Sequence, residues 1–306
     1  MGSPIPAVVV HHERPDAAAA TTTRFLEQDV PMRVIVVDSG SSTGARSRLH
    51  QLLDGRDAVD VIEMGANVGF GPGANAGLRR WLEEPDGQAG AFAVVAPHDA
   101  DPTPDCVRRV LAELQARPRA GLACAEYGPG EDWRPVVDKF FGGWFVPTLR
   151  RDGWEDVDYP HGTLLAIRRE TAREVGLFDE RFFAYCEEAD LGIRVRAAGW
   201  QVGLVWGAVV GNGRPPRADV ARYLQVRNTL LLLKKHFGTG PALARMTWEA
   251  GALLAGRDQP TLGVGLGAQP RDEGAERTAV RRATRLALRD FVRGRFGAPP
   301  ADLIPA

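Results

Sequence analysis

Short apolar runs alternate, along the first half of the chain, with segments in which apolar residues recur every three or four positions. Such runs are typical of buried strands, and such spacing is typical of amphipathic helices. The expected strands are Ile5 to Val10, Arg33 to Val37, Val59 to Met64, Phe92 to Ala96 and Gly121 to Ala125. Strands that alternate with helices in this way predict an α/β fold, with a mostly parallel sheet flanked by helices on both faces.

Polar residues follow three of these strands directly. Asp38 ends the second strand, a glycine-rich loop from Asn67 to Asn75 follows the third, and Asp99 and Asp101 follow the fourth. Ligands of such sheets bind beyond the carboxyl ends of the strands. We therefore expect one crevice to collect these residues.

The chemistry of these loops fits a charged ligand. Asp99 and Asp101 can both face a hard cation such as Mg²⁺ or Mn²⁺ that also holds a diphosphate. Gly69 allows a close approach of the backbone, and Asn67 and Asn75 offer amide groups. Each feature alone is explained equally well by an ordinary polar turn.

The segment from His161 to Trp200 combines an apolar strand, an aromatic cluster and three acids. Glu187, Glu188 and Asp190 fall in the first turn of a helix, where the macrodipole favours the ionised form of a carboxylate. A carboxylate that stays charged beside aromatic walls can act as a general base. Acids are also common at helix starts for structural reasons alone, and this alternative stays open.

Taken in order, these segments resemble family 2 glycosyltransferases, and in particular a bacterial rhamnosyltransferase-like branch. The resemblance covers roughly residues 5 to 235. The segments that carry it are Val36 to Ser42, Asn67 to Gly77, Asp99-x-Asp101, Gly162-Thr163, Val175 to Arg194, Gly199-Trp200 and Arg227-Asn228.

The resemblance implies a GT-A fold and an inverting transfer of a sugar from a nucleotide-diphosphate sugar, with a UDP- or dTDP-sugar expected, to an acceptor hydroxyl. It implies that Asp99 and Asp101 bind Mg²⁺ or Mn²⁺ and that Glu188 is the general base, with Glu187 and Asp190 beside it. The residues that it assigns to donor binding are His12, Glu13, Asp38, Asn67, Gly69, Asn75, Asp99, Gly162 and Thr163.

Three positions depart from the branch. Pro97-His98-Asp99 stands where Asn-Pro-Asp is usual, Glu187-Glu188 stands where Glu-Asp is usual, and Val209 to Asn212 lacks a metal-binding His. Two alternatives are therefore kept: a catalytically impaired nucleotide-sugar-binding protein and a sugar nucleotidyltransferase. The nucleotidyltransferase would leave Glu187-Glu188 without a role.

Composition narrows the cellular context. The 306 residues carry a net charge of −1, which gives no electrostatic case for nucleic acid. The three cysteines have no Cys-x-x-Cys spacing, which favours a reduced cytoplasm. No window approaches the roughly 18 apolar residues of a membrane span. We expect a cytoplasmic protein, with a peripheral position at the inner face of the membrane left open.

Two parts are expected along the chain: residues 1–236 as the nucleotide-sugar-binding and catalytic domain, and residues 237–306 as a C-terminal helical extension. Within the extension, the basic segment from Arg277 to Arg295 is expected to form a helix packed on the domain, and a membrane or partner surface is the alternative. The acceptor can be a glycan, a lipid-linked intermediate or a small molecule. The sugar, the nucleotide and the oligomeric state stay open.

Overall fold

The computed structural model describes residues 3–85, 90–128, 132–150, 152–213, 217–256 and 273–303. Strands and helices alternate in its first half, as the sequence predicts, and helices dominate its end. The elements are β1 (Ile5–His11), α1 (Pro15–Leu26), β2 (Met32–Asp38), α2 (Thr43–Leu53), β3 (Val59–Glu63), α3 (Phe70–Glu83), β4 (Phe92–Pro97), β5 (Ala100–Pro102), α4 (Cys106–Ala116), β6 (Ala120–Tyr127), β7 (Trp133–Asp138), β8 (Gly142–Pro147), β9 (Gly153–Asp156), β10 (Leu165–Arg168), α5 (Arg169–Val175), α6 (Glu187–Ala197), β11 (Gln201–Asn212), α7 (Ala218–Phe237), α8 (Thr239–Leu254) and α9 (Glu273–Val292).

The central sheet has the order β3-β2-β1-β4-β10-β6-β11-β5, with β9 also paired to β11. The half from β3 to β4 is parallel, as expected from the alternating pattern. The other half is mixed, because β10 runs antiparallel to β4 and β6, and β5 and β9 run antiparallel to β11. In the part of the chain that the structure describes, no crossover helix precedes β10, so the chain enters this strand from the edge of the sheet where the loops lie. β10 therefore runs opposite to its neighbours β4 and β6.

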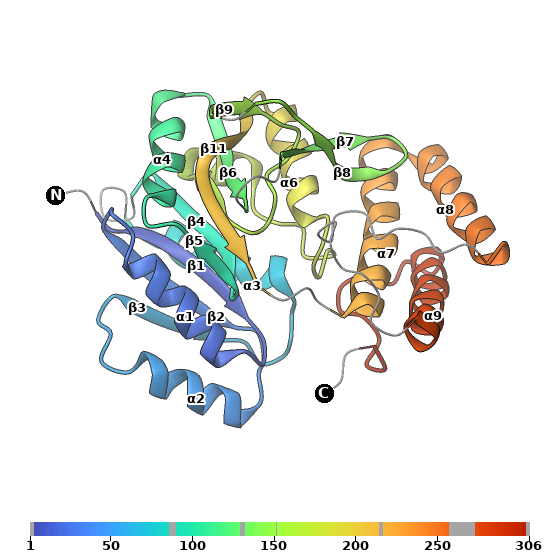
Figure 1. Cartoon of the computed structure of the whole chain (residues 1–306), viewed down its shortest axis with the longest axis horizontal. Coiled ribbons are helices and arrows are strands. Elements are labelled where there is room, and N and C mark those ends of the chain that lie inside the picture. Colours follow the sequence, from blue (N-terminus) through green and yellow to red (C-terminus); the bar gives the residue numbers. More distant parts are fainter. Residues whose placement is uncertain are drawn as a thin grey trace.

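Helices cover both faces of the sheet (Figure 1). Along β1, Ala7 and Val9 pack into a core with α1, α2 and α4, whereas Val8 and Val10 pack into a second core with α3, α5 and α6. This alternation is the period of two of a strand buried on both faces. The sheet therefore presents its carboxyl-terminal edge, and not a face, to a ligand.

Two segments contain strands that the alternating pattern of the first half does not predict. The β7–β8 hairpin and β9 lie between β6 and β10, and β11 extends from Gln201 to Asn212. Glycines interrupt the apolar pattern of β11, and the register with β6 shifts between Val205 and Val209, next to Gly207 with φ 82°. A strand that bends at a glycine loses the alternation that makes it visible in sequence.

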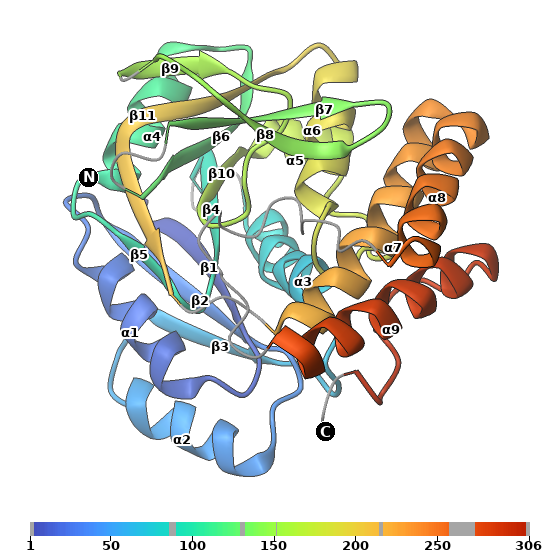
Figure 2. The ribbon, with the colours of Figure 1, turned by 45° about the vertical axis from the view of Figure 1, so that its right-hand side comes forward.

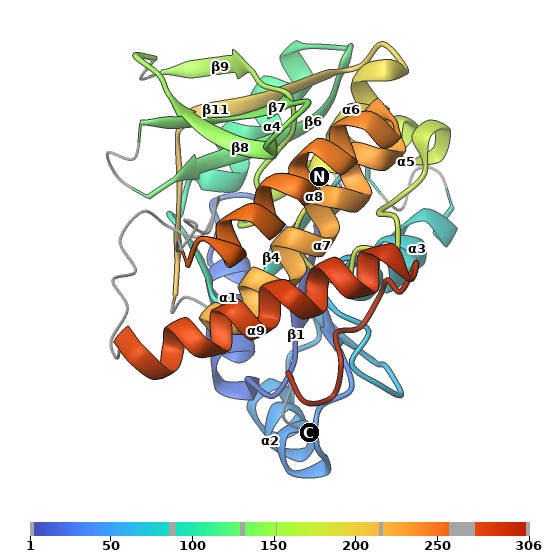
Figure 3. The same ribbon diagram turned by 90° about the vertical axis from the view of Figure 1, so that its right-hand side faces the viewer.

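The helices α7, α8 and α9 stand beside the sheet (Figure 2) and pack against one another, with α8 and α9 against α7 (Figure 3). A hydrophobic cluster joins Phe183, just before α6, to Tyr223 and Leu230 of α7 and to Ala287 and Phe291 of α9. The expected helix over the basic segment is therefore present and packed on the protein. None of the helices described here has both the length and the apolar character needed to cross a bilayer.

Candidate active site

A buried polar pair lies where β1 and β2 end. Asp38, the last residue of β2, is fully buried, and its Oδ1 lies 3.6 Å from Nε2 of His11, the last residue of β1. Ser41 donates its backbone N–H to Asp38 Oδ1 at 3.0 Å. Neither ring nitrogen of His11 has a hydrogen-bond partner within the described residues, and neither does Asp38 Oδ2. Because buried polar atoms are normally paired, this pair is suited to bind a polar ligand.

His12 and Glu13 connect the β1 loop to the β2 loop. His12 Nδ1 lies 2.9 Å from the carbonyl oxygen of Ser39. The Glu13 carboxylate accepts hydrogen bonds from the backbone N–H and the hydroxyl of Ser42, and the backbone bond is the main cause of its lowered pKa. Burial lowers the pKa of His11 to about 4, so His11 is neutral at pH 7. The structure thus brings His12, Glu13 and Asp38 together, as expected from the sequence.

The glycine-rich loop passes very close to the segment before α6. Gly69 has φ 88°, and a Cβ atom there would lie 2.1 Å from the carbonyl oxygen of Phe183. The same carbonyl accepts the N–H of Phe70 at 2.8 Å. Only glycine fits this position, because both the backbone conformation and the contact exclude a side chain.

The two asparagines of this loop are engaged with the protein. Asn67 Oδ1 accepts hydrogen bonds from Ser39 Oγ (3.3 Å) and from the N–H of Gly69 (3.1 Å). Asn75 is buried. Its Nδ2 donates a hydrogen bond to the carbonyl oxygen of Phe178 (2.9 Å), and its Oδ1 accepts one from the backbone N–H of Phe178 (3.0 Å). In this structure the Oδ1 atom of Asn67 and both amide atoms of Asn75 hold the loop in place.

Asp99 and Asp101 differ in environment. Asp99 is half-buried, and a Cβ atom at Gly213 would lie 3.2 Å from its Oδ2. Asp101 is exposed, and its Oδ1 lies 3.0 Å from Arg24 Nε. Among the residues that the structure describes, no three His, Cys, Asp or Glu side chains gather as a metal site.

This donor set fits a cation that is held partly by its substrate. Mg²⁺ is commonly bound through one or two carboxylates, with substrate phosphates and water as the other ligands. Asp99 supplies such a carboxylate. Asp101 can act as a second metal ligand if its ion pair with Arg24 breaks. Exposed ion pairs of this kind contribute only about 0–1 kcal/mol to the stability of a protein.

Glu187 and Glu188 open α6 after two residues with left-handed backbone conformations. Tyr185 has φ 69° and Cys186 has φ 71°, which is uncommon for residues with side chains. Asn228 of α7 donates to the carbonyl of Tyr185 at 2.9 Å. This bond helps to hold the strained turn that places the two carboxyl groups.

The two carboxyl groups form a coupled pair. Glu187 is 3% exposed, and burial and then the charge of Glu188 raise its pKa well above the ordinary value. Burial also raises the pKa of Glu188, to about 7, against the lowering effect of a hydrogen bond from Glu187. Both carboxyl groups therefore hold a proton more strongly than an exposed glutamate does.

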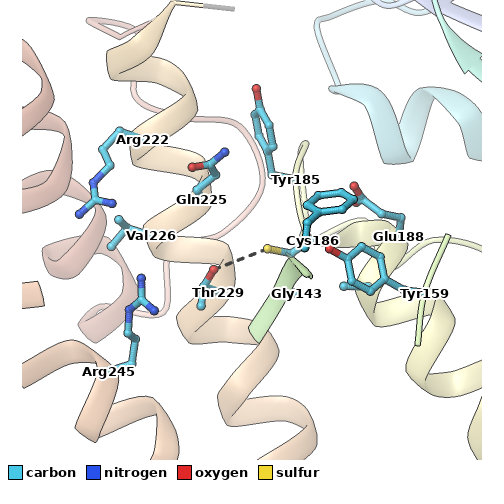
Figure 4. Close-up of a pocket in the computed structure, with 12 residues that line it drawn as sticks. Gly143, Tyr159, Tyr185, Cys186, Glu188, Arg222, Gln225, Val226, Thr229 and Arg245 are labelled. Carbon is cyan, nitrogen blue, oxygen red and sulfur yellow. Dashed lines mark hydrogen bonds between the residues drawn. The ribbon is translucent and has the colours of Figure 1, made fainter. Parts of the chain in front are cut away.

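Glu188 lines an open pocket with about 580 Å³ of empty space, part of which is open solvent (Figure 4). A Cβ atom at Gly162 would lie 3.5 Å from Glu188 Oε1, so Gly162 is adjacent to the carboxylate. Thr163 is buried next to it, and its N–H donates to His161 Nδ1 at 3.4 Å. The other lining residues are Gly143, Phe145, Tyr159, Tyr185, Cys186, Ala189, Arg222, Gln225, Val226, Thr229 and Arg245.

Tyr185 connects this pocket to the end of β4. Burial is the main cause of the raised pKa of its phenol, and the charges of Glu187, Glu188 and Asp99 raise it further. Tyr185 lines the pocket together with Glu188.

Asp190 lies in a different environment from the other two acids. It is fully buried and lies 2.9 Å from Arg194 Nε, 2.7 Å from His236 Nε2 and 2.5 Å from Lys235 Nζ. Burial raises the pKa of Asp190, but these bonds outweigh that effect and the net pKa is lowered. Asp190 thus ties α6 to the end of α7 and does not line the pocket.

Several residues of the site are absent from the sequence-based prediction, and those with charged or amide side chains or an imidazole include His11, Arg222, Gln225 and Arg245. His11 continues the alternation of inward-facing side chains along β1, and this pattern could have identified it. Arg222 and Gln225 are buried polar residues of α7, and they stand among other polar residues of that helix, so the sequence does not single them out. Arg245 comes from α8, far along the chain, and has no local signal.

Comparison with known proteins identifies the family. The model of "Glycosyl transferase family 2" matches residues 7–176, which is more than half of the chain. The chain belongs to glycosyl transferase family 2. As a member of this family it is a glycosyltransferase, as the motifs predict.

Two curated relatives of this chain are glycosyltransferases by name. This chain is 27% identical to the N-acetylglucosaminyl-diphospho-decaprenol L-rhamnosyltransferase of Mycobacterium tuberculosis. The alignment spans 266 residues and covers 75% of this chain and 83% of the relative. This chain is also 26% identical over 177 residues, 55% of each chain, to the low-salt glycan biosynthesis hexosyltransferase Agl10 of Haloferax volcanii.

Solved structures of glycosyltransferases share its fold, which is the expected GT-A fold. The mannosyltransferase PcManGT of Pyrobaculum calidifontis, in complex with GDP-Man and Mn²⁺, has a TM-score of 0.58 at 17% identity, over 95% of this chain and 88% of that one. GalNAc-T7 with UDP, GalNAc and Mn²⁺ has a TM-score of 0.59 at 14% identity, over 81% and 54% of the two chains.

Proposed function

We propose that this glycosyltransferase transfers a hexose from a UDP- or dTDP-sugar to an acceptor hydroxyl, with inversion at the anomeric carbon and with Glu188 as general base. One observation supports this most strongly. Glu188 borders the pocket, and its pKa of about 7 lies where a base that works near neutral pH is most effective.

On the donor side, Asp38 and the neutral His11 bind the base or the ribose through their unpaired polar atoms. Asp99 holds Mg²⁺ or Mn²⁺, which would neutralise charge on the leaving diphosphate. The Mn²⁺ named with the two solved structures supports a divalent ion.

On the acceptor side, Glu188 takes the proton of the hydroxyl as its oxygen attacks the anomeric carbon from the face opposite the diphosphate. Glu187 keeps its proton and donates a hydrogen bond to Glu188, which orients the carboxylate and moderates its pKa. A single displacement of this kind inverts the configuration. The Tyr159, Tyr185 and Phe145 side chains line the pocket and provide apolar walls for an acceptor sugar.

One relative supports a proposal for the acceptor class. The name of the mycobacterial relative contains a diphospho-decaprenol carrier, and this supports a lipid-linked acceptor. A free glycan or a small molecule is the alternative.

A panel of UDP-, dTDP- and GDP-sugars tests the proposal, each with Mg²⁺, Mn²⁺ or EDTA. We expect one nucleotide class to raise the melting temperature, and only with metal, because a ligand that binds the native state alone stabilises it. Slow hydrolysis of that donor, followed by NMR, should yield first the sugar of inverted anomeric configuration. Retained configuration would refute the inverting mechanism, and stabilisation unaffected by EDTA would refute the metal.

A further inference from the structure

Three charged side chains are buried together on one side of the pocket. Arg222 of α7 and Arg245 and Glu249 of α8 are at most 5% exposed. Arg222 Nη2 donates to one carboxylate oxygen of Glu249, and Arg245 donates to the other from Nε (3.1 Å) and Nη2 (2.8 Å). Two guanidinium groups thus share one carboxylate, and within the part of the chain that the structure describes the cluster carries one uncompensated positive charge.

An uncompensated buried charge is costly to the fold. Part of the cost is offset locally, because Arg222 Nε donates to Thr284 Oγ1 (3.1 Å) and Arg245 lies over the ring of Trp248 (4.6 Å to its centroid). Neither contact supplies a negative charge. Both arginines line the pocket, so an anion that enters it meets this charge directly.

Gln225 gives an independent indication of a ligand. It lies one turn along α7 from Arg222, lines the same pocket, and is 8% exposed. Neither its Nε2 nor its Oε1 has a hydrogen-bond partner within the described part of the chain. Figure 4 shows Gln225 and the two arginines on the α7–α8 side of the pocket and Glu188 on the other side. A buried amide with both atoms unpaired is costly unless a ligand engages it.

We propose that Arg222, Gln225 and Arg245 form a subsite for an anionic phosphate group of the acceptor. This subsite rests on the proposed function, which places the acceptor hydroxyl at Glu188. Guanidinium groups match phosphate in geometry and charge, and the Gln225 amide adds a hydrogen bond to a phosphate or sugar oxygen. The subsite lies opposite the base, so it fixes which hydroxyl of the acceptor faces Glu188.

Binding of N-acetylglucosamine 1-phosphate and of the neutral methyl N-acetylglucosaminide, measured by calorimetry, tests the subsite. Excess nucleoside diphosphate and metal fill the donor site during the titration. We expect the wild type to bind the phosphate probe at least about tenfold more tightly than the neutral one. Equal binding of the two probes would overturn the proposal.

Two variants separate this subsite from a purely structural cluster. Arg245→Met leaves Glu249 paired with Arg222 but removes the donors to the second Glu249 oxygen and to the carbonyl of Phe140, so it is expected to fold with a lowered melting temperature. Gln225→Leu removes an unpaired amide, so it is expected to fold with a melting temperature no lower than that of the wild type. Each should lose most of the preference for the phosphate probe. Arg48→Met, on the exposed face of α2, removes the same charge far from the pocket and should leave the preference intact. An unchanged preference in Arg245→Met would overturn the subsite.

A third probe, N-acetylglucosamine diphosphate linked to a short prenyl chain, distinguishes a lipid-linked acceptor from a soluble sugar phosphate. Tighter binding than the soluble probe identifies a lipid-linked acceptor, and equal binding identifies a soluble sugar phosphate; both support the anionic subsite. Donor hydrolysis is measured in parallel. A phosphate preference without any hydrolysis would refute the proposed function alone, whereas hydrolysis without the preference would refute the subsite alone.

Discussion

Replacing Glu188 by Gln is expected to stabilise the fold while abolishing transfer. Burial raises the pKa of Glu188 from 4.5 to about 7, so the folded state disfavours the ionised form relative to the unfolded state. Below about pH 4.5 the group is protonated in both states and costs nothing. Between about pH 4.5 and pH 7 the unfolded chain releases this proton while the folded protein retains it, so wild-type stability falls across that range and levels off above about pH 7. Gln keeps the size of the side chain and removes this charge.

The size of the effect follows from the pKa. A rise of about 2.5 in the pKa, at about 1.4 kcal/mol for each pKa unit, gives about 3 kcal/mol at pH 8. This is an upper value, because Glu187 loses its charged neighbour in the same variant and then ionises more readily. At roughly 2 °C for each kcal/mol in a chain of this size, the melting temperature should rise by about 4–6 °C.

Thermal unfolding at pH 5 and pH 8 measures the effect, and a transfer assay accompanies it. The gain in melting temperature should be small at pH 5 and largest at pH 8, and transfer should be lost while donor binding persists. Glu180→Gln is the matched control. Burial raises the pKa of Glu180, but bonds from Arg79 and Asn75 outweigh it and lower the net pKa, so this variant should lose stability at pH 8. Equal melting temperatures of Glu188→Gln and the wild type at pH 8, or wild-type transfer, would refute the reasoning.

Three further changes test other parts of the site. Asp99→Asn should abolish the metal-dependent stabilisation by the donor in thermal shift; an unchanged metal response would exclude Asp99 as a ligand. Asp38→Asn should weaken nucleoside diphosphate binding by about tenfold in calorimetry, because a charged acceptor is lost, and wild-type affinity would argue against contact with the nucleotide. Gly69→Ala should cost about 2 kcal/mol in denaturant unfolding, because its Cβ would lie 2.1 Å from a carbonyl oxygen. Gly65→Ala, in the same loop with open space around it, should cost much less.

The sequence predicted the parallel half of the sheet well, and it also predicted that His12, Glu13 and Asp38 meet at the carboxyl-terminal edge of that half. Both predictions depend on local patterns. The apolar run of β2 ends at Asp38, and the strand pairing of β1 with β2 places His11 directly opposite it. A parallel sheet carries the ends of adjacent strands to one edge, so residues that follow those strands must meet.

Other features depend on contacts that no local pattern records. Asn75 looks like a ligand-binding amide in sequence, yet its partner Phe178 lies about a hundred residues along the chain. Asp190 shares a helix turn with Glu188 but faces Lys235 and His236 because the helical repeat turns it to another side. Arg245 reaches the pocket only through the packing of α8 on α7.

The packing of α8 on α7 also bears on how such enzymes diversify. The family model ends at residue 176, whereas Glu188, Gln225 and Arg245 all follow it. In the proposed mechanism, the base and the anionic subsite thus come from α6, α7 and α8, whereas Phe145 and Tyr159 of the same pocket lie within the matched segment. We expect substitutions in α7 and α8 to change the recipient of the sugar and to leave the choice of donor unchanged.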